Sequence, residues 1–251
     1  MRTRFFVDTA LAAGRELALP PGPARHVQVL RLQPGVALRL FDGSGGEWDA
    51  VVTRIGRSEV CVRVGMHAEV ECETSRRVTL AVGMPANDRM DTLVEKATEL
   101  GAAAIVPLVC ERSVLRLDPD RAARRVAHWR GVAIAACEQS GRNRLPQLHA
   151  VATFADWLRA LPVIKDAAGA ARDARWMLSL APEAAGAATT LAALAPDAQV
   201  CVLSGPEGGL SPNEESLARA AGFAPVGLGP RVLRADTAPL AALAILACAA
   251  A

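Results

Sequence analysis

The chain has 251 residues, enough for one large domain or two smaller ones with a substantial core. Its formal net charge of +2 is close to neutral, so charge alone neither requires nor excludes a nucleic-acid partner. Lys96 and Lys165 are the two lysines among 28 basic residues. Arginine suits phosphate and carboxylate recognition, although a GC-rich genome explains the same bias.

The six cysteines lack the close spacing of zinc sites and redox pairs, so we expect reduced, mostly buried thiols. Residues 1–8 have no sustained apolar run behind their charges, which predicts no secretory signal. The apolar tail from Leu240 to Ala251 is too short to span a bilayer and predicts a packed helix. We therefore expect a cytoplasmic protein with no membrane partner.

The first 72 residues consist of short strand-like runs separated by turns. Val36–Phe41 and Glu47–Val52 flank a Gly-rich turn and predict a β-hairpin. Residues 59–64 alternate between apolar and polar side chains, as a half-buried strand does. Together these elements predict a small barrel or curled sheet.

A short helix is expected over residues 24–31, where His26 either contacts RNA or simply lies at the cap of a packed helix. The segment 69–77 is polar and charged. We place a domain boundary there, between a first domain of residues 1–72 and a second of residues 76–251.

Beyond this boundary, strand-like runs alternate with amphipathic helical stretches, which predicts an α/β fold with a largely parallel sheet covered by helices. In such sheets, ligands bind at the carboxyl ends of the strands. We expect strands at 78–84, 104–108, 175–180, 199–204 and 224–227, and helices at 88–101, 118–139, 212–221 and 236–249.

Two further segments are less regular. Residues 165–175 have no clear period and predict a surface connection. Residues 184–195 are rich in alanine, the best helix former, and predict a helix.

A Gly-rich loop follows the strand that ends at Ser204. Ser211, Pro212 and Glu214 form a capping-box pattern that opens the next helix. Glycines between Gly205 and Gly209 let backbone amides approach a ligand closely. The same pattern also fits a tight turn with a well-made cap, so the loop by itself leaves both interpretations open.

A second loop holds Arg231 and Arg234 in a Gly-Pro turn, with Asp236 or Thr237 as the cap of the final helix. The two arginines are suited to gripping phosphate or to stabilising negative charge that develops on a base. A buried ion pair with Asp236 or Glu207 is the competing interpretation.

Polar residues at two helix ends are further candidates. Arg89 lies at a helix start, where a cation opposes the helix dipole, and this misfit favours an anionic partner. Glu138, Gln139 and Arg142 gather at another helix end, which fits either a ligand contact or a solvated terminus. The sequence has no metal cluster, Walker loop or Ser-His-Asp order, which argues against metalloenzymes, ordinary nucleotide-binding proteins and hydrolases.

These motifs, in this order along nearly the whole chain, resemble the 16S rRNA (uracil-N3)-methyltransferase family of the SPOUT class. The segments that carry the resemblance are Arg4-Phe5-Phe6, His26 to Arg31, Phe41-Asp42-Gly43, Arg89 to Gly101, Glu138 to Arg142, Gly205 to Ser211 and Leu228 to Ala238.

The resemblance implies a PUA-like RNA-binding β-barrel over residues 1–72. It also implies an α/β methyltransferase domain over residues 76–251 whose end is threaded into a trefoil knot. It further implies S-adenosylmethionine as the cofactor, a homodimer, no metal, and 16S rRNA within the 30S subunit as the substrate.

Site residues follow from the same resemblance. The cofactor site is predicted to comprise Leu178, Ser179, Leu180, Gly205, Pro206, Gly208, Leu228, Gly229, Val232, Leu233, Thr237 and Ala238. The residues predicted to contact RNA are Arg4, Arg25, Arg31, Arg89, Glu138, Gln139 and Arg142. The predicted catalytic residues are Arg234, Arg231 and Glu207.

Two positions depart from the family pattern. Ala86-Asn87 replaces Lys-Gly, which removes a phosphate-facing lysine, and Ala235-Asp236 replaces Thr-Glu, which puts the role of that carboxylate in doubt. The expected activity is S-adenosylmethionine-dependent methylation of the N3 atom of one uridine in 16S rRNA. The alternatives are a SPOUT methyltransferase with another RNA target, a non-catalytic RNA-binding assembly factor, and a small-molecule enzyme of ordinary α/β type.

Overall fold

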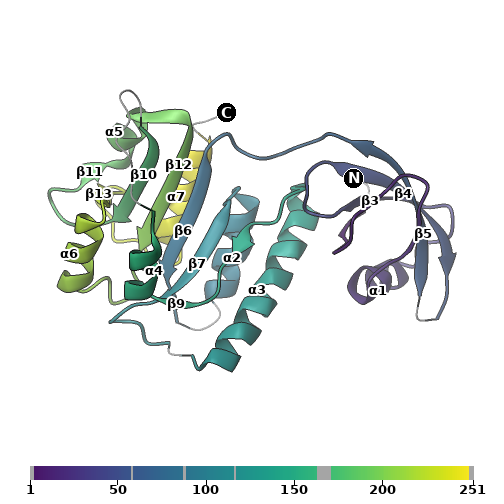
Figure 1. Ribbon diagram of the computed structural model, residues 1–251, viewed down its shortest axis with the longest axis horizontal. Helices are drawn as coiled ribbons and strands as arrows, with labels where there is room; N and C mark the ends of the chain where they lie inside the picture. Colours follow the sequence, from purple (N-terminus) through teal and green to yellow (C-terminus); the bar gives the residue numbers. More distant parts are fainter. Residues whose placement is uncertain (1–2, 58, 87–88, 116, 163–170, 249–251) are drawn as a thin grey trace. The chain divides into compact units, whose positions relative to one another are not determined.

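The computed structural model describes residues 3–57, 59–86, 89–115, 117–162 and 171–248 (Figure 1). The chain divides into two compact units. Residues 1–73 and 134–145 form the first unit, and residues 74–133 and 146–251 form the second. The sequence placed the whole segment 134–145 in the second domain, whereas its contacts assign it to the first unit.

In the described part of the first unit, five strands form a mixed sheet in the order β1-β3-β4-β5-β2. Strand β1 runs parallel to β3, and the other pairings are antiparallel. The predicted hairpin is confirmed as β3 and β4. The elements are β1 (Arg4–Phe6), β2 (Glu16–Ala18), α1 (Pro21–Val29), β3 (Ala37–Phe41), β4 (Glu47–Ile55) and β5 (Val60–Ala68).

Alternating side chains of these strands build the core of the first unit. Phe5, Leu38, Leu40 and Val62 are fully buried, because every second residue of a strand points to the same face of the sheet. Val27 of α1 packs into the same cluster. The predicted small curled sheet is therefore confirmed.

The second unit contains an eight-stranded sheet within the described residues. Its order is β11-β13-β10-β12-β6-β7-β8, with β9 paired to β7, and every described pairing is parallel. The strands are β6 (Arg77–Gly83), β7 (Ala104–Val109), β8 (Gln147–Leu148), β9 (Ala152–Thr153), β10 (Ala171–Leu178), β11 (Ala185–Gly186), β12 (Leu194–Ser204) and β13 (Ala224–Gly227). This confirms the predicted parallel α/β domain.

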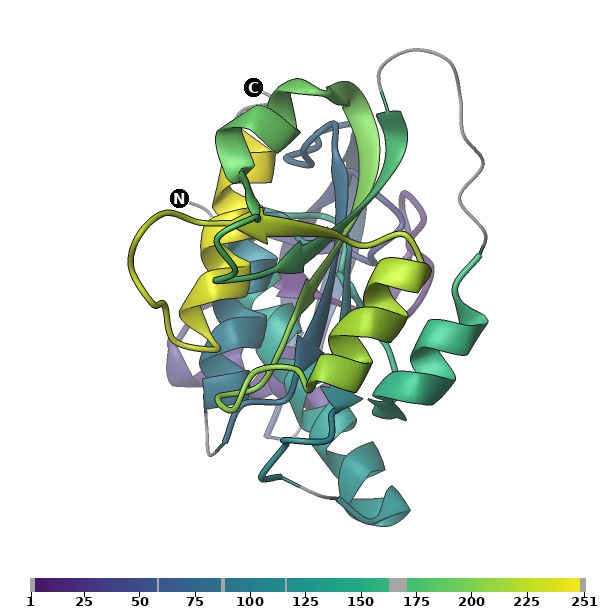
Figure 2. The same cartoon turned by 90° about the vertical axis from the view of Figure 1, so that its left-hand side faces the viewer.

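Helices cover both faces of this sheet (Figure 2). They are α2 (Arg89–Glu99), α3 (Pro119–Ser140), α4 (Phe154–Ala160), α5 (Ala187–Ala192), α6 (Pro212–Ala220) and α7 (Thr237–Cys248). Helices α2 and α7 lie on one face, where Leu93 and Leu243 are fully buried. Helices α4 and α6 lie on the other face, where Trp157 and Ala218 join a second cluster. Both faces are covered, so the central strands consist of almost continuously apolar residues.

Strand β13 lies between β10 and β11, although β10 and β11 are consecutive along the chain. Ser179 follows β10 directly, and its N–H donates to the carbonyl of Val226 in β13 at 3.0 Å. This bond holds the segment that leaves β10 against the inserted strand. A later strand is therefore inserted between two strands that precede it in the chain, and the trefoil knot stays a prediction.

Several expectations need correction. Strand β10 begins at Ala171, so residues 171–175 are not a surface connection; residues 165–170 lie outside the described residues. Helix α5 is shorter than the Ala-rich stretch 184–195, because β12 already begins at Leu194. Helix α4 was not predicted.

The tail prediction is confirmed, because α7 buries Ala242, Leu243 and Leu246 completely. None of the helices in the described residues is long and apolar enough to cross a membrane. All six cysteines are free, and burial raises the pKa of Cys110 to about 12 and that of Cys137 to about 11.

Leu80 of β6 offers a test of this core. The Leu80→Ala variant removes a fully buried side chain and leaves a cavity, so we expect the free energy of unfolding to fall by about 2–5 kcal/mol. The matched Leu217→Ala change, at a side chain that is 42% exposed, should lower it by about 1 kcal/mol or less. Urea denaturation followed by circular dichroism measures both, and equal losses would contradict this description of the core.

Candidate functional site

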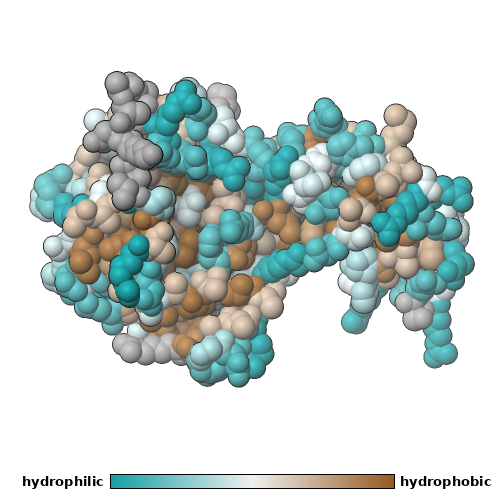
Figure 3. All heavy atoms as spheres, in the orientation of Figure 1, coloured by the Kyte–Doolittle hydropathy of each residue, from teal (hydrophilic) through white to brown (hydrophobic). Residues whose placement is uncertain are grey.

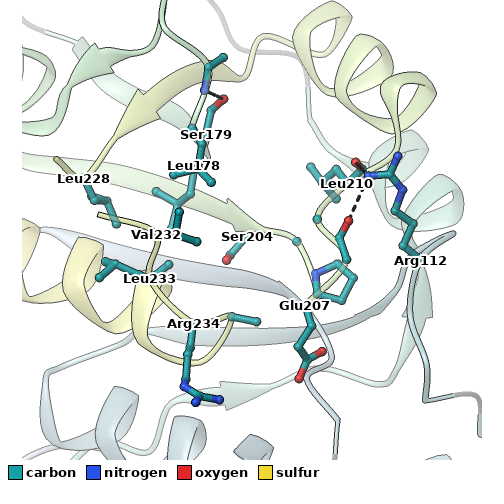
Figure 4. Close-up of a pocket in the computed structure, with 18 of the residues that line it drawn as sticks. Arg112, Leu178, Ser179, Ser204, Glu207, Leu210, Leu228, Val232, Leu233 and Arg234 are labelled. Carbon is teal, nitrogen blue, oxygen red and sulfur yellow. Dashed lines mark hydrogen bonds between the residues drawn. The ribbon is translucent and has the colours of Figure 1, made fainter. Parts of the chain in front are cut away.

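A pocket of about 640 Å³ lies at the carboxyl ends of β10, β12 and β13 in the second unit (Figure 4). It lies between the Gly-rich loop that follows β12 and the loop that joins β13 to α7. Its lining residues are Arg89, Arg112, Leu178, Ser179, Leu180, Ala181, Ser204, Gly205, Pro206, Glu207, Gly208, Gly209, Leu210, Glu215, Val226, Leu228, Arg231, Val232, Leu233, Arg234, Ala235 and Ala238.

The Gly-rich loop is held at its far end by the predicted capping box. The Glu214 N–H donates to Ser211 Oγ at 3.1 Å, and the Ser211 N–H donates to Glu214 Oε2 at 2.9 Å. Glu214 is only 3% exposed, and its other oxygen, Oε1, accepts from the Glu111 N–H at 2.9 Å. One buried carboxylate therefore joins the start of α6 to the segment that follows β7.

Two glycines of this loop have conformational roles. Gly209 has φ +69°, a left-handed conformation that glycine adopts without strain, and its N–H donates to the Pro206 carbonyl at 2.8 Å. A Cβ atom on Gly205 would lie 2.8 Å from Leu210 N. The loop folds back on itself closely enough that position 205 has no room for a side chain.

Arg112 supports the same loop from outside, and the sequence did not predict this role. Its Nη1 donates to the Gly208 carbonyl at 3.0 Å and to the Leu210 carbonyl at 3.1 Å (Figure 4). The sequence signal is weak, because Arg112 is a single arginine in a short turn after β7. Ser204, Leu210 and Val226 also line the pocket without having been predicted.

The second loop leaves several backbone amides open. Gly229 has φ +100°, and the Arg234 carbonyl accepts from the N–H groups of Thr237 and Ala238 at the start of α7. Within the described residues, the N–H groups of Leu228, Val232 and Leu233 donate to no other residue of the chain. Those amides are available to acceptor atoms of a ligand.

Charged groups gather at one edge of the pocket. Figure 4 shows the Arg234 and Glu207 side chains extending toward the same edge. Glu207 Oε1 accepts from the Ala86 N–H at 2.9 Å and lies 3.7 Å from Arg89 Nη1. Arg231 and Arg234 are exposed and make no ion pair with a described residue, so the competing interpretation, a buried ion pair with Asp236 or Glu207, is not what the structure has.

Most of the predicted cofactor residues come together in this pocket. Ten of the twelve line it; Gly229, in the β13–α7 loop, and Thr237, the first residue of α7, are not among the lining residues. The predicted catalytic residues Arg231, Arg234 and Glu207 also line it, as does Arg89 from the predicted RNA-contacting set. Asn87, at the first departure from the family pattern, lies outside the described residues.

The other predicted RNA contacts belong to the first unit, where some are engaged internally. Arg4 is paired with Glu47 and donates to Asn143 Oδ1 at 2.7 Å. Arg142 is 3% exposed and donates to Glu73 Oε2 at 2.6 Å.

Glu138 accepts from the Phe6 N–H at 2.9 Å. Burial raises its pKa, although the Phe6 hydrogen bond and the nearby positive charges of His26 and Arg4 oppose that shift. For Arg4, Arg142 and Glu138, these contacts favour a structural role over the predicted contact with RNA. Arg25, Arg31 and Gln139 are exposed.

The described residues contain no group of three His, Cys, Asp or Glu side chains arranged to hold an ion. The pocket instead combines apolar walls, open amides and arginines. That composition suits an organic ligand with polar ends together with an anionic partner.

Comparison with known proteins agrees with this geometry. Residues 72–247 match the family model described as RNA methyltransferase domain, and residues 24–65 match the one described as RNA methyltransferase PUA domain. A protein of Synechocystis named ribosomal RNA small subunit methyltransferase E is 36% identical over 220 residues, covering 86% of this chain and 67% of its own.

Solved structures of methyltransferases are similar to this chain over nearly its whole length. A putative methyltransferase from Legionella pneumophila, in complex with the bound cofactor SAM, has a TM-score of 0.89 and 31% identity, covering 99% of this chain and 98% of its own. A ribosomal RNA small subunit methyltransferase E from Neisseria gonorrhoeae, bound to S-adenosyl methionine, has a TM-score of 0.85 and 32% identity, covering 97% of this chain and 96% of its own.

Glu138 provides a test of the structural role. The Glu138→Gln variant keeps an acceptor for the Phe6 N–H and removes a charge that burial disfavours. A raised folded-state pKa means that ionised Glu138 weakens folding at high pH and has no effect below its unfolded pKa. We expect the variant and the parent to be equally stable below about pH 4, and the variant to be the more stable as pH rises toward 7.

Urea denaturation at several pH values measures this difference. The matched Glu69→Gln change, at an exposed carboxylate, should show no such trend. If the Glu138→Gln variant is less stable than the parent at pH 7, the expectation is contradicted, and the ionised Glu138 of the parent is instead stabilised by Arg4.

Proposed function

The chain belongs to the RNA methyltransferase family, and we propose that it transfers a methyl group from S-adenosylmethionine to the N3 atom of one uridine in 16S rRNA. The observation that carries the proposal is the pocket formed by the Gly-rich loop and the β13–α7 loop, with its open amides and its arginine-lined edge. The family match over residues 72–247 includes the whole pocket.

The pocket residues fit S-adenosylmethionine in size and chemistry. A volume of about 640 Å³ lies within the range of about 300–1,000 Å³ that is typical of small-molecule sites. Leu178, Val226 and Leu228 offer apolar walls for a flat ring, and the Val232 and Leu233 amides offer donors to its nitrogens. When bound, S-adenosylmethionine supplies a methyl group activated by the positive charge of its sulfonium.

The arginines at the pocket edge carry positive charge that can stabilise the uracil base when it loses its N3 proton. Removing the proton from uracil N3 leaves negative charge on the two flanking carbonyl oxygens. Arg234 or Arg231 would donate hydrogen bonds to these oxygens and stabilise that charge, while Arg89 would hold a neighbouring phosphate. Aligning N3 with the methyl group is the other contribution of the pocket.

Glu207 is the candidate for orienting or accepting the N3 proton. Its Oε1 is occupied by the Ala86 N–H and faces Arg89, whereas its Oε2 has no partner among the described residues. Oε2 would therefore be the atom that meets the proton.

A homodimer, a 30S-bound substrate and a cytoplasmic location complete the proposal. Leu180 and Val232, which are 68% and 78% exposed, lie at the pocket rim. Exposed apolar side chains beside a binding site favour a protein partner, and we propose that a second copy covers them. Light scattering should give twice the chain mass of 26.3 kDa.

The decisive experiment is methylation in vitro with the purified protein and labelled S-adenosylmethionine. Unmodified 30S subunits, naked 16S RNA and transfer RNA would be offered in parallel, and the product nucleoside mapped by mass spectrometry. We expect 3-methyluridine at one position, with 30S subunits preferred. A methyl group on another RNA would favour a different target, and no methylation despite RNA binding would favour an assembly factor.

Gly205 tests the cofactor loop. In Gly205→Ala the new Cβ would meet backbone atoms of residues 209 and 210, so the loop must shift. We expect the Kd for S-adenosylmethionine, measured by calorimetry, to rise about tenfold or more. In the control Gly131→Ala, on an exposed turn of α3 with open space around the new Cβ, affinity should not change and stability should rise by about 0.5–1 kcal/mol.

Arg234 tests the charge stabilisation. The Arg234→Ala variant should lower kcat by about 10²–10³-fold without changing the Kd for S-adenosylmethionine, because the side chain acts on charge that develops during the reaction. Arg231→Ala, measured alongside, decides which arginine carries the role. Arg219→Ala, whose side chain pairs with Glu183, serves as the surface control. Full activity in both pocket variants would refute the assignment.

A further inference from the structure

Helix α3 carries a stripe of basic side chains that the proposed site does not use. Arg124 and Arg125 lie three and four residues after Arg121, and His128 lies four and three residues after them, which places all four on one face of the helix. They line a surface hollow of about 250 Å³. In Figure 3, hydrophilic side chains gather over these first turns of α3.

The stripe is unfavourable for the helix itself. Positive side chains in the first turns oppose the helix dipole, and like charges three or four residues apart repel each other. Within the described residues, none of the three arginines forms an ion pair, although Asp120 lies four residues before Arg124. On α2, by contrast, Lys96 is paired with Glu95 and Glu99.

Residues that destabilise their own helix, as these positive charges do, are expected mainly at functional sites. Uncompensated arginines on an exposed helix face fit a ligand that itself supplies negative charge at several points.

The stripe begins at the same edge of the sheet as the pocket. Strand β7 ends at Val109, and the segment that leads on to α3 contains Arg112, which is bonded to the Gly-rich loop. His128 Nε2 lies 2.7 Å from Asp91 Oδ2, and Asp91 is two residues from Arg89, which lines the pocket. The basic face of α3 and the arginines at the pocket edge are thus joined through the first turn of α2.

Two of the acidic groups near the stripe, Asp91 and Asp118, already make other contacts. Asp91 also accepts from Trp129 Nε1 at 2.9 Å, and Asp118 Oδ1 accepts from the Arg121 N–H at 2.9 Å. Both carboxylates therefore orient the helix, and neither pairs with an arginine side chain of the stripe.

We infer that the stripe of Arg121, Arg124, Arg125 and His128 binds the sugar–phosphate backbone of the RNA substrate beside the nucleotide that enters the pocket. The inference rests on the proposed function. Guanidinium groups bind phosphate oxygens in pairs, and such contacts position a nucleic acid without reading its sequence. The stripe thus contributes to substrate affinity and to register, while the pocket provides the chemistry.

The test compares two variants with equal loss of charge. One replaces Arg121, Arg124 and Arg125 with glutamine. The control replaces Arg159, Arg172 and Arg219 with glutamine, three exposed arginines that pair with acidic side chains elsewhere in the second unit. Binding of unmodified 30S subunits and of naked 16S RNA is measured at several salt concentrations, together with methylation kinetics.

For the stripe variant we expect RNA affinity to fall on the order of tenfold near 0.1 M salt. The slope of log affinity against log salt should fall by roughly 2, because each lost phosphate contact removes roughly 0.7–0.9. The KM for RNA should rise while kcat and the Kd for S-adenosylmethionine stay unchanged. The control variant should match the parent in all of these measurements.

Unchanged affinity and salt slope in the stripe variant, or equal losses in both variants, would overturn the inference. The RNA-binding assay tests the stripe even if the parent protein fails to methylate RNA. Failure of the proposed function can therefore be distinguished from failure of this inference. The stripe variant lacks the repulsion between the arginines, so its melting temperature should be equal to that of the parent or higher. If the triple variant does not fold, the single changes Arg121→Gln and Arg124→Gln replace it, each with a slope change of roughly 0.7.

Discussion

The insertion of β13 between β10 and β11 is the constraint on which the pocket depends. Parallel strands end at the same edge of a sheet, so the loops that follow β12 and β13 emerge side by side, although some twenty residues separate them along the chain. The hydrogen bond from Ser179 to Val226 fixes the strand that lies between them. Neither loop alone encloses a volume; the pocket exists because the sheet order brings them together.

Glu214 and Arg112 hold the Gly-rich loop rigidly along one side of the pocket. A buried carboxylate is costly unless its oxygens are hydrogen-bonded, and Glu214 accepts from two backbone amides. Arg112 holds two carbonyls of the Gly-rich loop. The loop presents its backbone to the pocket without relying on side chains of its own. A loop held in this way keeps its shape before a ligand arrives, which reduces the entropy lost on binding.

Local patterns were predicted well and non-local partners were not. The capping box at Ser211 and the hairpin of β3 and β4 depend on neighbouring residues, and both were read from the sequence. The start of β10 was missed, because residues 171–174 become a strand only by pairing with residues 194–200. The contact between Arg142 and RNA was predicted from the family resemblance, and nothing nearby in the sequence reveals that Arg142 also pairs with Glu73, 69 residues away.

The distribution of charge explains how a nearly neutral chain can serve a polyanionic substrate. Salt screens interactions beyond about 8 Å at physiological ionic strength, so an approaching RNA responds to local arginines and hardly at all to the net charge of +2. Many arginines elsewhere, such as Arg39, Arg54 and Arg144, are paired with carboxylates. Within the described second unit, unpaired arginines include Arg231 and Arg234 at the pocket edge and the three arginines of the α3 stripe. These unpaired arginines place local positive charge at the two surfaces that we propose bind the RNA.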